Sequence, residues 1–191
     1  MNVNKSLLLH GAAISLTFIG MISTKPQPEM LYFKDDGLIP NSRFPLLLYR
    51  DVFPETGSEG ASWLEQRFSV NNWTNSWRNG VFSYHHYHST SHEVLGVYSG
   101  SAVLHLGGEK GQKVRVKAGD IMVIPAGVGH KKLEASADFG VVGAYPDGRS
   151  YDVLRGKPGD RPQADQNIAA VPMPKTDPFL GKDGGLVRLW N

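Results

Sequence analysis

The chain has no cysteine among its 191 residues, and this absence removes several kinds of site. Disulfides, zinc–thiolate sites, iron–sulfur clusters and cysteine nucleophiles are all excluded. The chain also lacks an excess of either charge, because 20 basic and 18 acidic residues leave a formal net charge of +2. No run of lysine and arginine marks a surface for nucleic acid, so we expect no nucleic-acid partner.

Long apolar runs are scarce as well, apart from one at residues 6–23. Polar residues and glycines interrupt it at positions 10, 11, 17 and 20. Only Lys5 is basic before it and no Ala-x-Ala cleavage site appears, so it fits an export signal only in part. A membrane anchor needs about 20 apolar residues, which makes this one marginal. We expect no stable membrane span and favour the cytoplasm, with export as the alternative. A true start at Met21, or a disordered tail, explains the segment as well as export does.

Glycine and proline are abundant by contrast, with 22 and 12 residues. This share favours many short strands joined by turns, so the expected class is all-β. The length fits one domain with a core of ordinary size. We expect residues 1–29 to be an N-terminal apolar segment and linker, and residues 30–191 to be a single domain with a C-terminal arm.

The local pattern predicts one helix and several strands. Apolar residues with helical spacing predict a helix from residue 58 to about 71, in which Ser62 and Glu65 have the form of a capping box. The run at 44–50 is apolar on both faces, as in a strand packed on both sides. Beyond residue 146 we expect an extended arm that Trp190 holds down by burial. The other predicted strands are 31–33, 94–99, 102–106, 113–117, 121–124 and 139–144.

The candidate site begins with histidines crowded into residues 85–92, followed directly by Glu93. In a strand, successive side chains alternate faces, so His86 and His88 point one way and His85 the other. A carboxylate after the strand and an imidazole from a distant strand would complete an N3O set suited to a divalent transition metal. His92 is the rival ligand, because the register at the strand end is uncertain by one residue. The predicted metal ligands are His86, His88, Glu93 and His130.

The spacing of these residues resembles the paired motifs of the cupin superfamily. The first motif runs from Gly80 through five residues to His86, one to His88, four to Glu93 and six to Gly100. The second runs from Gly119 through five residues to Pro125, one to Gly127 and two to His130. Glu134 departs from this family's pattern, which commonly has asparagine there. The chain looks most like small single-domain bacterial cupins of a branch without an assigned reaction.

The resemblance implies a double-stranded β-helix, the RmlC-like cupin or jelly-roll barrel, with one short N-terminal helix. It also implies a metal-dependent enzyme, of the oxygenase (dioxygenase-like) or isomerase type, acting on a small polar metabolite. Iron or manganese is favoured, with zinc or nickel next. The alternative is a non-catalytic cupin that binds or senses a small molecule. Tyr84 and Arg78 are candidate catalytic or substrate-orienting residues.

We also expect a homodimer in which the 44–49 segment or the C-terminal tail covers the open edges of the strands.

Overall fold

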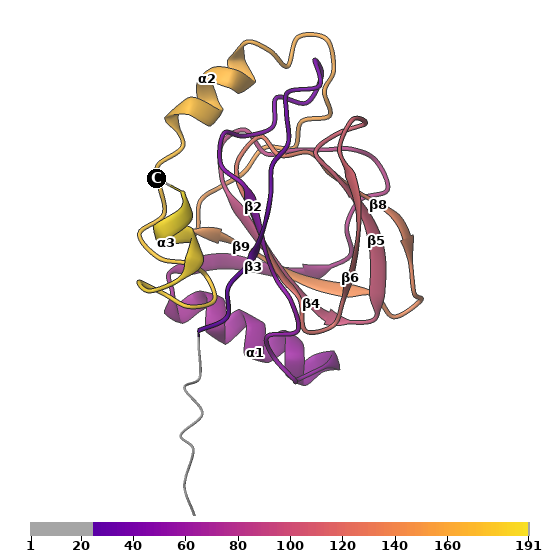
Figure 1. Ribbon diagram of the computed structural model, residues 1–191, viewed down its shortest axis with the longest axis vertical. Helices are drawn as coiled ribbons and strands as arrows, with labels where there is room; N and C mark the ends of the chain where they lie inside the picture. Colours follow the sequence, from indigo (N-terminus) through magenta and orange to yellow (C-terminus); the bar gives the residue numbers. More distant parts are fainter. Residues whose placement is uncertain (1–24, 191) are drawn as a thin grey trace, which may run out of the picture.

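The computed structural model describes residues 25–190, which form two antiparallel β-sheets that face each other (Figure 1). The predicted all-β class and the double-stranded β-helix are confirmed, with few helices added to the two sheets. The apolar segment at 6–23, and with it the choice between export and retention, lies outside the described residues. Within the described part, no helix is long and apolar enough to cross a membrane.

The two sheets differ in size, and all of their strand pairs are antiparallel. The large sheet has the order β1 (Glu29–Leu31), β2 (Leu46–Tyr49), β7 (Ile121–Ile124), β4 (Glu93–Ser99), β9 (Gly140–Pro146) and β3 (Trp73–Asn79). The small sheet has the order β6 (Gln112–Lys117), β5 (Ser101–Leu106) and β8 (His130–Ala135).

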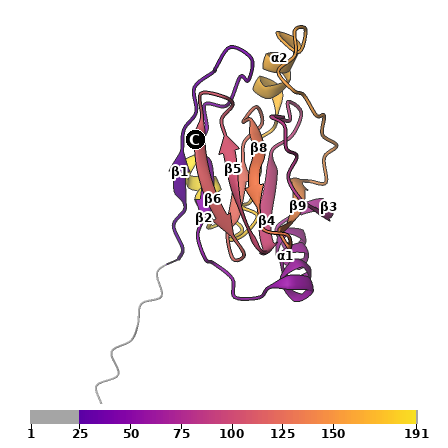
Figure 2. The same ribbon diagram turned by 90° about the vertical axis from the view of Figure 1, so that its right-hand side faces the viewer.

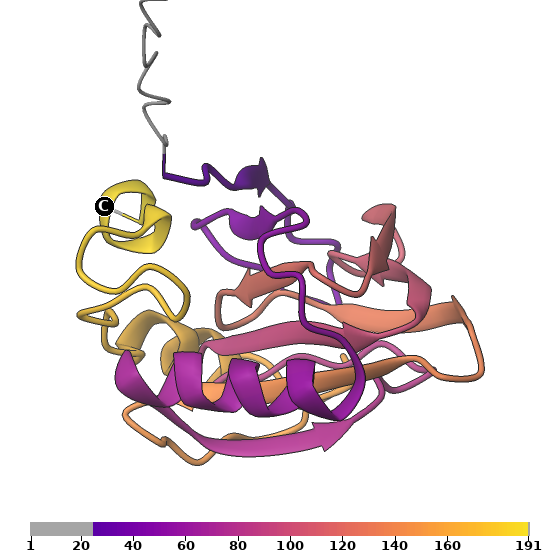
Figure 3. The same ribbon diagram turned by 90° about the horizontal axis from the view of Figure 1, so that it is seen from below.

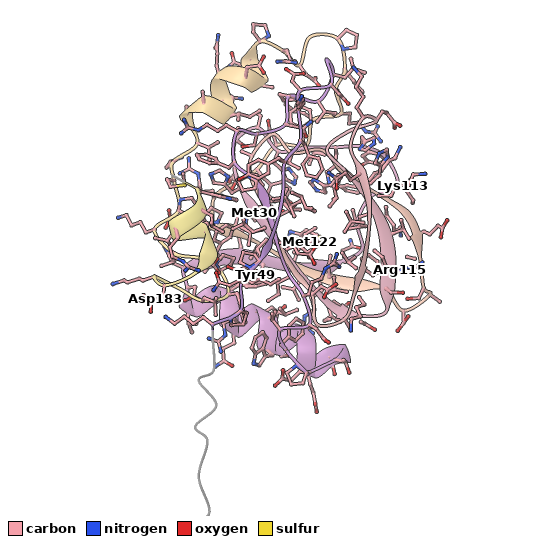
Figure 4. All side chains as sticks on the ribbon, viewed as in Figure 1. Met30, Tyr49, Lys113, Arg115, Met122 and Asp183 are labelled. Carbon is pink, nitrogen blue, oxygen red and sulfur yellow. The ribbon has the colours of Figure 1, made fainter. Side chains whose placement is uncertain are left out.

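The main core fills the space between the sheets. Leu95 and Met122 of the large sheet and Leu104 of the small one belong to the same buried cluster. In Figure 4, Met122 lies in the interior while Lys113 and Arg115 lie on the side of the small sheet. The alternation on β5 turns its leucines inward.

A second core lies on the outer face of the large sheet, against α1 (Gly57–Val70) and α3 (Gly185–Leu189). Figure 3 shows α1 running along this face. Leu46 and Leu48 of β2 enter the first core, whereas Leu47 and Tyr49 enter the second. The prediction that this strand is packed on both faces is confirmed.

The predicted helix is present, but its predicted capping box is wrong. The helix begins at Gly57 after Thr56, which makes no side-chain cap hydrogen bond. Ser62 therefore lies in the second turn, where its hydroxyl donates to the Ser58 carbonyl oxygen at 3.0 Å. Glu65 instead pairs with Arg78, so neither residue is free to cap the helix.

The histidine-bearing segment, residues 80–92, is not the regular strand that the sequence predicts. It makes only isolated bridges, His86 to His130 and Tyr87 to Leu154, because the backbone bends before and after them. The alternation nevertheless survives locally, since His86 and His88 are at most 5% exposed and on the same side as His130.

The tail beyond β9, residues 147–190, is named here the C-terminal arm. It is extended at 171–174, as predicted, but it also forms α2 (Gln163–Ala170) and α3, which the sequence reading missed (Figures 1 and 2). Trp190 is 1% exposed and its indole N–H donates to the Pro45 carbonyl oxygen at 2.8 Å. The expected burial of Trp190 is therefore confirmed, and it fastens the arm to the large sheet.

Candidate metal centre

Three imidazoles from distant parts of the chain meet between the sheets. His130 begins β8, and its backbone exchanges two hydrogen bonds with that of His86, at 2.9 and 3.2 Å. This pairing sets the two rings 4.0 Å apart between centroids. With His88, they offer three ligand atoms that all lie within 4.8 Å of one another.

Glu93 brings a carboxylate to the same place. It is the first residue of β4, and its side chain is 3% exposed. Its Oε2 lies 3.4 Å from the Nε2 of His88 and 3.4 Å from the Nε2 of His130. The four side chains that the sequence predicted as a set therefore come together.

The histidine tautomers are set by backbone carbonyl oxygens. The Nδ1 of His86 lies 3.4 Å from the carbonyl oxygen of Tyr84, and that of His130 lies 3.1 Å from the carbonyl oxygen of Val128. The Nδ1 of His88 faces the carbonyl oxygen of Asp152. Because a carbonyl only accepts, each Nδ1 carries the hydrogen and each neutral ring keeps the Nε2 lone pair for a ligand.

Two of the donor atoms have no hydrogen-bond partner. The Nε2 of His88 and the Oε2 of Glu93 are buried and make no hydrogen bond with any described residue. Buried polar atoms rarely stay unpaired, so an ion or water is expected there. Two ligands about 2.1 Å from one ion are about 3.0 Å apart at an octahedral angle and about 3.4 Å apart at a tetrahedral one, so the two Nε2–Oε2 distances of 3.4 Å lie within the range that one ion spans. The donor set thus fits a divalent transition metal.

The electrostatics agree with this set of donors. Burial, with His130 and His88 nearby, lowers the pKa of His86 to about 2, so its ring is neutral. Burial opposes the charging of His88, but the Glu93 carboxylate outweighs it and raises the pKa of His88. Burial likewise opposes ionisation of Glu93, yet His88 and His130 hold its pKa well below the usual range. The centre therefore keeps an ionised Glu93 carboxylate and a neutral His86 at neutral pH, while Glu93 favours a proton on His88 that a bound metal ion would displace.

A hydrogen-bonded chain holds the other oxygen of Glu93. The Trp77 indole N–H donates to the Tyr145 hydroxyl at 2.8 Å, and that hydroxyl donates to Glu93 Oε1 at 2.9 Å. Tyr151 stacks on Tyr145, with ring centroids 4.2 Å apart. The positioning role of Trp77 and Tyr145 therefore emerges from the structure.

A cavity of about 360 Å³ opens onto the donor set. Its lining includes Arg78, but that guanidinium donates to both oxygens of Glu65 at 2.7 Å. Tyr84 is not part of the lining. Its ring stacks on Phe82 at 4.9 Å and lies under the Arg155 guanidinium at 3.4 Å. The remaining lining residues are Trp77, Asn79, Gly80, Val81, Phe82, His86, His88, Glu93, Leu95, His130, Lys132, Tyr145 and Tyr151.

Lys132 and Tyr151 are among the lining residues that were missed at the sequence level. Lys132 follows His130 by two positions on β8, so strand alternation could have placed it on the same face. Its ammonium makes no hydrogen bond or ion pair with a residue in the described range. Tyr151 lies in the C-terminal arm, where no motif indicated it.

The remaining histidines of the cluster point elsewhere. The Nδ1 of His92 accepts the Ala126 N–H at 2.9 Å, and the ring packs on Trp190 at 4.9 Å. His92 is therefore not part of the group formed by His86, His88 and His130. His85 lies on the other side, against His105, with ring centroids 4.9 Å apart.

Comparison with known proteins identifies relatives of this chain. A family model described as "Cupin domain" matches residues 78–136, which include all four donor residues. "Uncharacterized protein YjlB" of Bacillus subtilis (strain 168) is 46% identical over 165 residues, which cover 86% of this chain and 97% of that protein.

Solved structures with detectable similarity are more distant. Acireductone dioxygenase from Bacillus anthracis, solved with a cadmium ion in its active centre, is 13% identical, with a TM-score of 0.40. The match covers 56% of this chain and 82% of that one. A variant of Bacillus subtilis oxalate decarboxylase is 17% identical, with a TM-score of 0.35, and the match covers 61% of this chain but only 29% of the decarboxylase.

Proposed function

Because this chain belongs to the cupin superfamily, we propose that it is a metal-dependent enzyme that acts on a small polar metabolite. The proposed reaction is of the oxygenase or isomerase type. The proposed metal is iron or manganese first, and zinc or nickel next. The proposed ligands are His86, His88, Glu93 and His130.

The observation that carries the proposal is the pair of buried, unpartnered donor atoms on His88 and Glu93. Three imidazoles and one carboxylate are a set that iron, manganese, zinc and nickel all accept. Four protein ligands leave about two positions on an octahedral ion, where it would act as a Lewis acid toward a metabolite.

The protein's own side chains would then hold and orient that metabolite. Phe82 and Tyr151 line the cavity with aromatic surface that excludes water. Lys132, which has no anionic partner among the described residues, is available to a negative group of the metabolite. Arg78 would have to leave Glu65 before it could do the same, so Lys132 is the better candidate.

The test is metal loading of the purified protein followed by a search for turnover. We expect metal-free protein, reconstituted anaerobically, to bind close to one Mn(II) or Fe(II) ion per chain. Replacing any one of the four ligands by alanine should weaken that binding strongly, whereas His92→Gln should not. Protein that folds but binds neither ion would overturn the proposal.

The alternative, a non-catalytic sensor, is decided in the same samples. Oxygen uptake by the Fe(II)-loaded protein and product formation by the Mn(II)-loaded protein are measured across a panel of small carboxylic and hydroxy acids. Turnover of any member supports the enzyme. A compound that raises the melting temperature of the loaded protein without being consumed supports the sensor instead.

We also propose that residues 30–191 form one functional domain that works in the cytoplasm as a homodimer. The closely packed sheets and the return of the arm to the large sheet favour a single unit. Separation of native cells into cytoplasmic and exported fractions tests the location. Recovery of the protein mainly outside the cytoplasm would contradict it.

A further inference from the structure

We infer a second transition-metal site on the outer face of the small sheet, made by His85, His105 and Glu109. It is separate from the proposed active site and does not depend on it. One ligand atom from each of these three side chains lies within 4.8 Å of the others. This site would take an ion that prefers imidazole, such as Zn(II), Ni(II) or Cu(II).

The fold brings the three residues together from three places. His105 is on β5 and faces away from the leucines that flank it. Glu109 is in the turn between β5 and β6, and His85 is in the histidine-bearing segment. The Nε2 of His85 lies 3.2 Å from Glu109 Oε1, about the separation of two ligands on one tetrahedral ion.

The second observation is the state of the His85 ring. Its side chain is 10% exposed, and both of its ring nitrogens are buried without a hydrogen-bond partner among the described residues. The contact with Glu109 is close, but it lacks the geometry of a hydrogen bond. A buried imidazole with two unpaired nitrogens is rare in native proteins. An ion between His85, His105 and Glu109 would satisfy one of those nitrogens directly.

Lysines next to this cluster limit its affinity and its choice of metal. The Lys131 ammonium lies 2.6 Å from Glu109 Oε1, and Lys131 and Lys113 are the cross-strand neighbours of His105. Glu109 has a second oxygen and is 70% exposed, so it can turn toward an ion. The positive neighbours disfavour ions that bind mainly through charge, such as Mn(II), and leave those that bind imidazole strongly.

The position of the cluster suggests what an ion there would do. His85 and His86 are adjacent in sequence, and their side chains lie on opposite sides of the segment. The segment has few backbone hydrogen bonds to its neighbours. An ion held by His85, His105 and Glu109 would fasten the histidine-bearing segment to β5 and to the turn after β5. It would thereby keep the neighbouring proposed metal ligands His86 and His88 in place.

The test counts Zn(II) by equilibrium dialysis against a competing chelator. Wild-type protein should bind about two ions per chain, and Glu109→Gln and His105→Ala about one. His88→Ala, which removes a ligand of the other site, should retain the second ion. Lys131→Met should bind the second ion several-fold more tightly, because it removes a competing cation.

The Glu109 variant must fold normally for its zinc count to be informative. Glu109 is exposed, so Glu109→Gln should fold like the wild type, as circular dichroism and thermal unfolding can verify. Co(II) gives an independent readout, since the visible spectrum of its second equivalent should vanish in Glu109→Gln. Equal zinc stoichiometry in wild type and Glu109→Gln, or no effect of Lys131→Met on the weaker site, would overturn the inference.

Discussion

Tyr145 links the wall of the cavity to the proposed metal ligand Glu93. Its hydroxyl donates to Glu93 Oε1 and accepts from Trp77, so Tyr145→Phe would leave both without this partner. We expect the Mn(II) affinity to fall about 10- to 100-fold, the usual cost of losing a group that orients a metal ligand. Isothermal titration of metal-free protein with Mn(II) measures this.

A matched control for this change is Tyr87→Phe. The Tyr87 hydroxyl is also buried, but it makes no hydrogen bond with a described residue and it is not part of the cavity lining. Its loss should leave the Mn(II) affinity unchanged. If Tyr145→Phe and Tyr87→Phe behave alike, the hydrogen bond to Glu93 does not position a ligand.

His92 makes the stability of the protein depend on pH. Burial, with Arg149 nearby, lowers the pKa of His92 from 6.5 to about 4. Between these values the unfolded chain binds a proton that the folded chain does not, so the stability present above pH 6.5 is lost as the pH falls toward 4. The expected loss is on the order of 3 kcal/mol.

Urea unfolding at several pH values between 7 and 4, in a chelator that keeps the protein metal-free, measures the effect. Other buried histidines contribute to the total, so the comparison is with His92→Gln. That variant should show a shallower fall in unfolding free energy with acid. Parallel curves for the two proteins would show that His92 is not the group responsible.

The sequence predicted which four side chains come together at the candidate centre. Strand alternation placed His86 and His88 on one side, and the resemblance to the cupin motifs added Glu93 and His130. Tyr151 and the Asp152 carbonyl oxygen could not be predicted in the same way. They reach the centre from an irregular arm, where no repeat relates sequence position to direction.

At the scale of elements, the neighbouring strands β3 and β9 pack closely where the side chain of Trp77 lies over Gly143. Trp77 is the cross-strand partner of Gly143, and a Cβ atom at position 143 would overlap the Trp77 indole. Gly143→Ala should therefore cost about 1–3 kcal/mol of unfolding free energy through overpacking. It should also weaken Mn(II) binding, because the displaced indole no longer supports Tyr145.

Chemical denaturation and Mn(II) titration check the two effects of Gly143→Ala. Gly80→Ala is the control, since a Cβ atom there would meet only the flexible end of Lys132, at 3.9 Å. We expect that control to remain within about 0.5 kcal/mol of the wild type. A Gly143→Ala protein of unchanged stability would mean that the indole can move without cost.

The strands were predicted best where at least one face is apolar. The strands at β4, β5, β6 and β7 match their predictions to within one residue. The strands β3 and β8 were missed because Trp73–Asn79 and His130–Ala135 are mostly polar, and their pairing depends on partners far along the chain. The helix α2 was missed for a similar reason, since only Ala164 of it is buried.

At the scale of the whole molecule, the 44–49 segment and the C-terminal arm were both expected to cover strand edges between subunits. Both instead pack against the large sheet of their own chain. The prediction for residues 44–49 is wrong in this respect, because β2 is paired on both sides, with β1 and β7. The end of the arm packs on the same sheet through Trp190. The large sheet has open edges at β1 and β3, and at the β1 edge Met30 and the following Tyr32 are 47% and 60% exposed.

We expect the homodimer to form through this β1 edge, since an unpaired apolar edge favours pairing with a second copy. Light scattering should give about twice the chain mass of 21.0 kDa. Tyr32→Lys should shift the protein toward the monomer, and Leu133→Lys on the small sheet should not. A wild-type monomer at micromolar concentration would contradict the prediction.

The contribution of the C-terminal arm to the centre has a consequence for biosynthesis. A ribosome makes all four proposed ligands before it reaches Tyr151 and Asp152, and it adds Trp190 later still. A nascent chain that stops soon after His130 would carry every ligand but no acceptor for the Nδ1 of His88. The centre can therefore mature only after the first part of the arm has been made. Stop codons between His130 and Tyr151 would spare every ligand and still be as damaging as the loss of one.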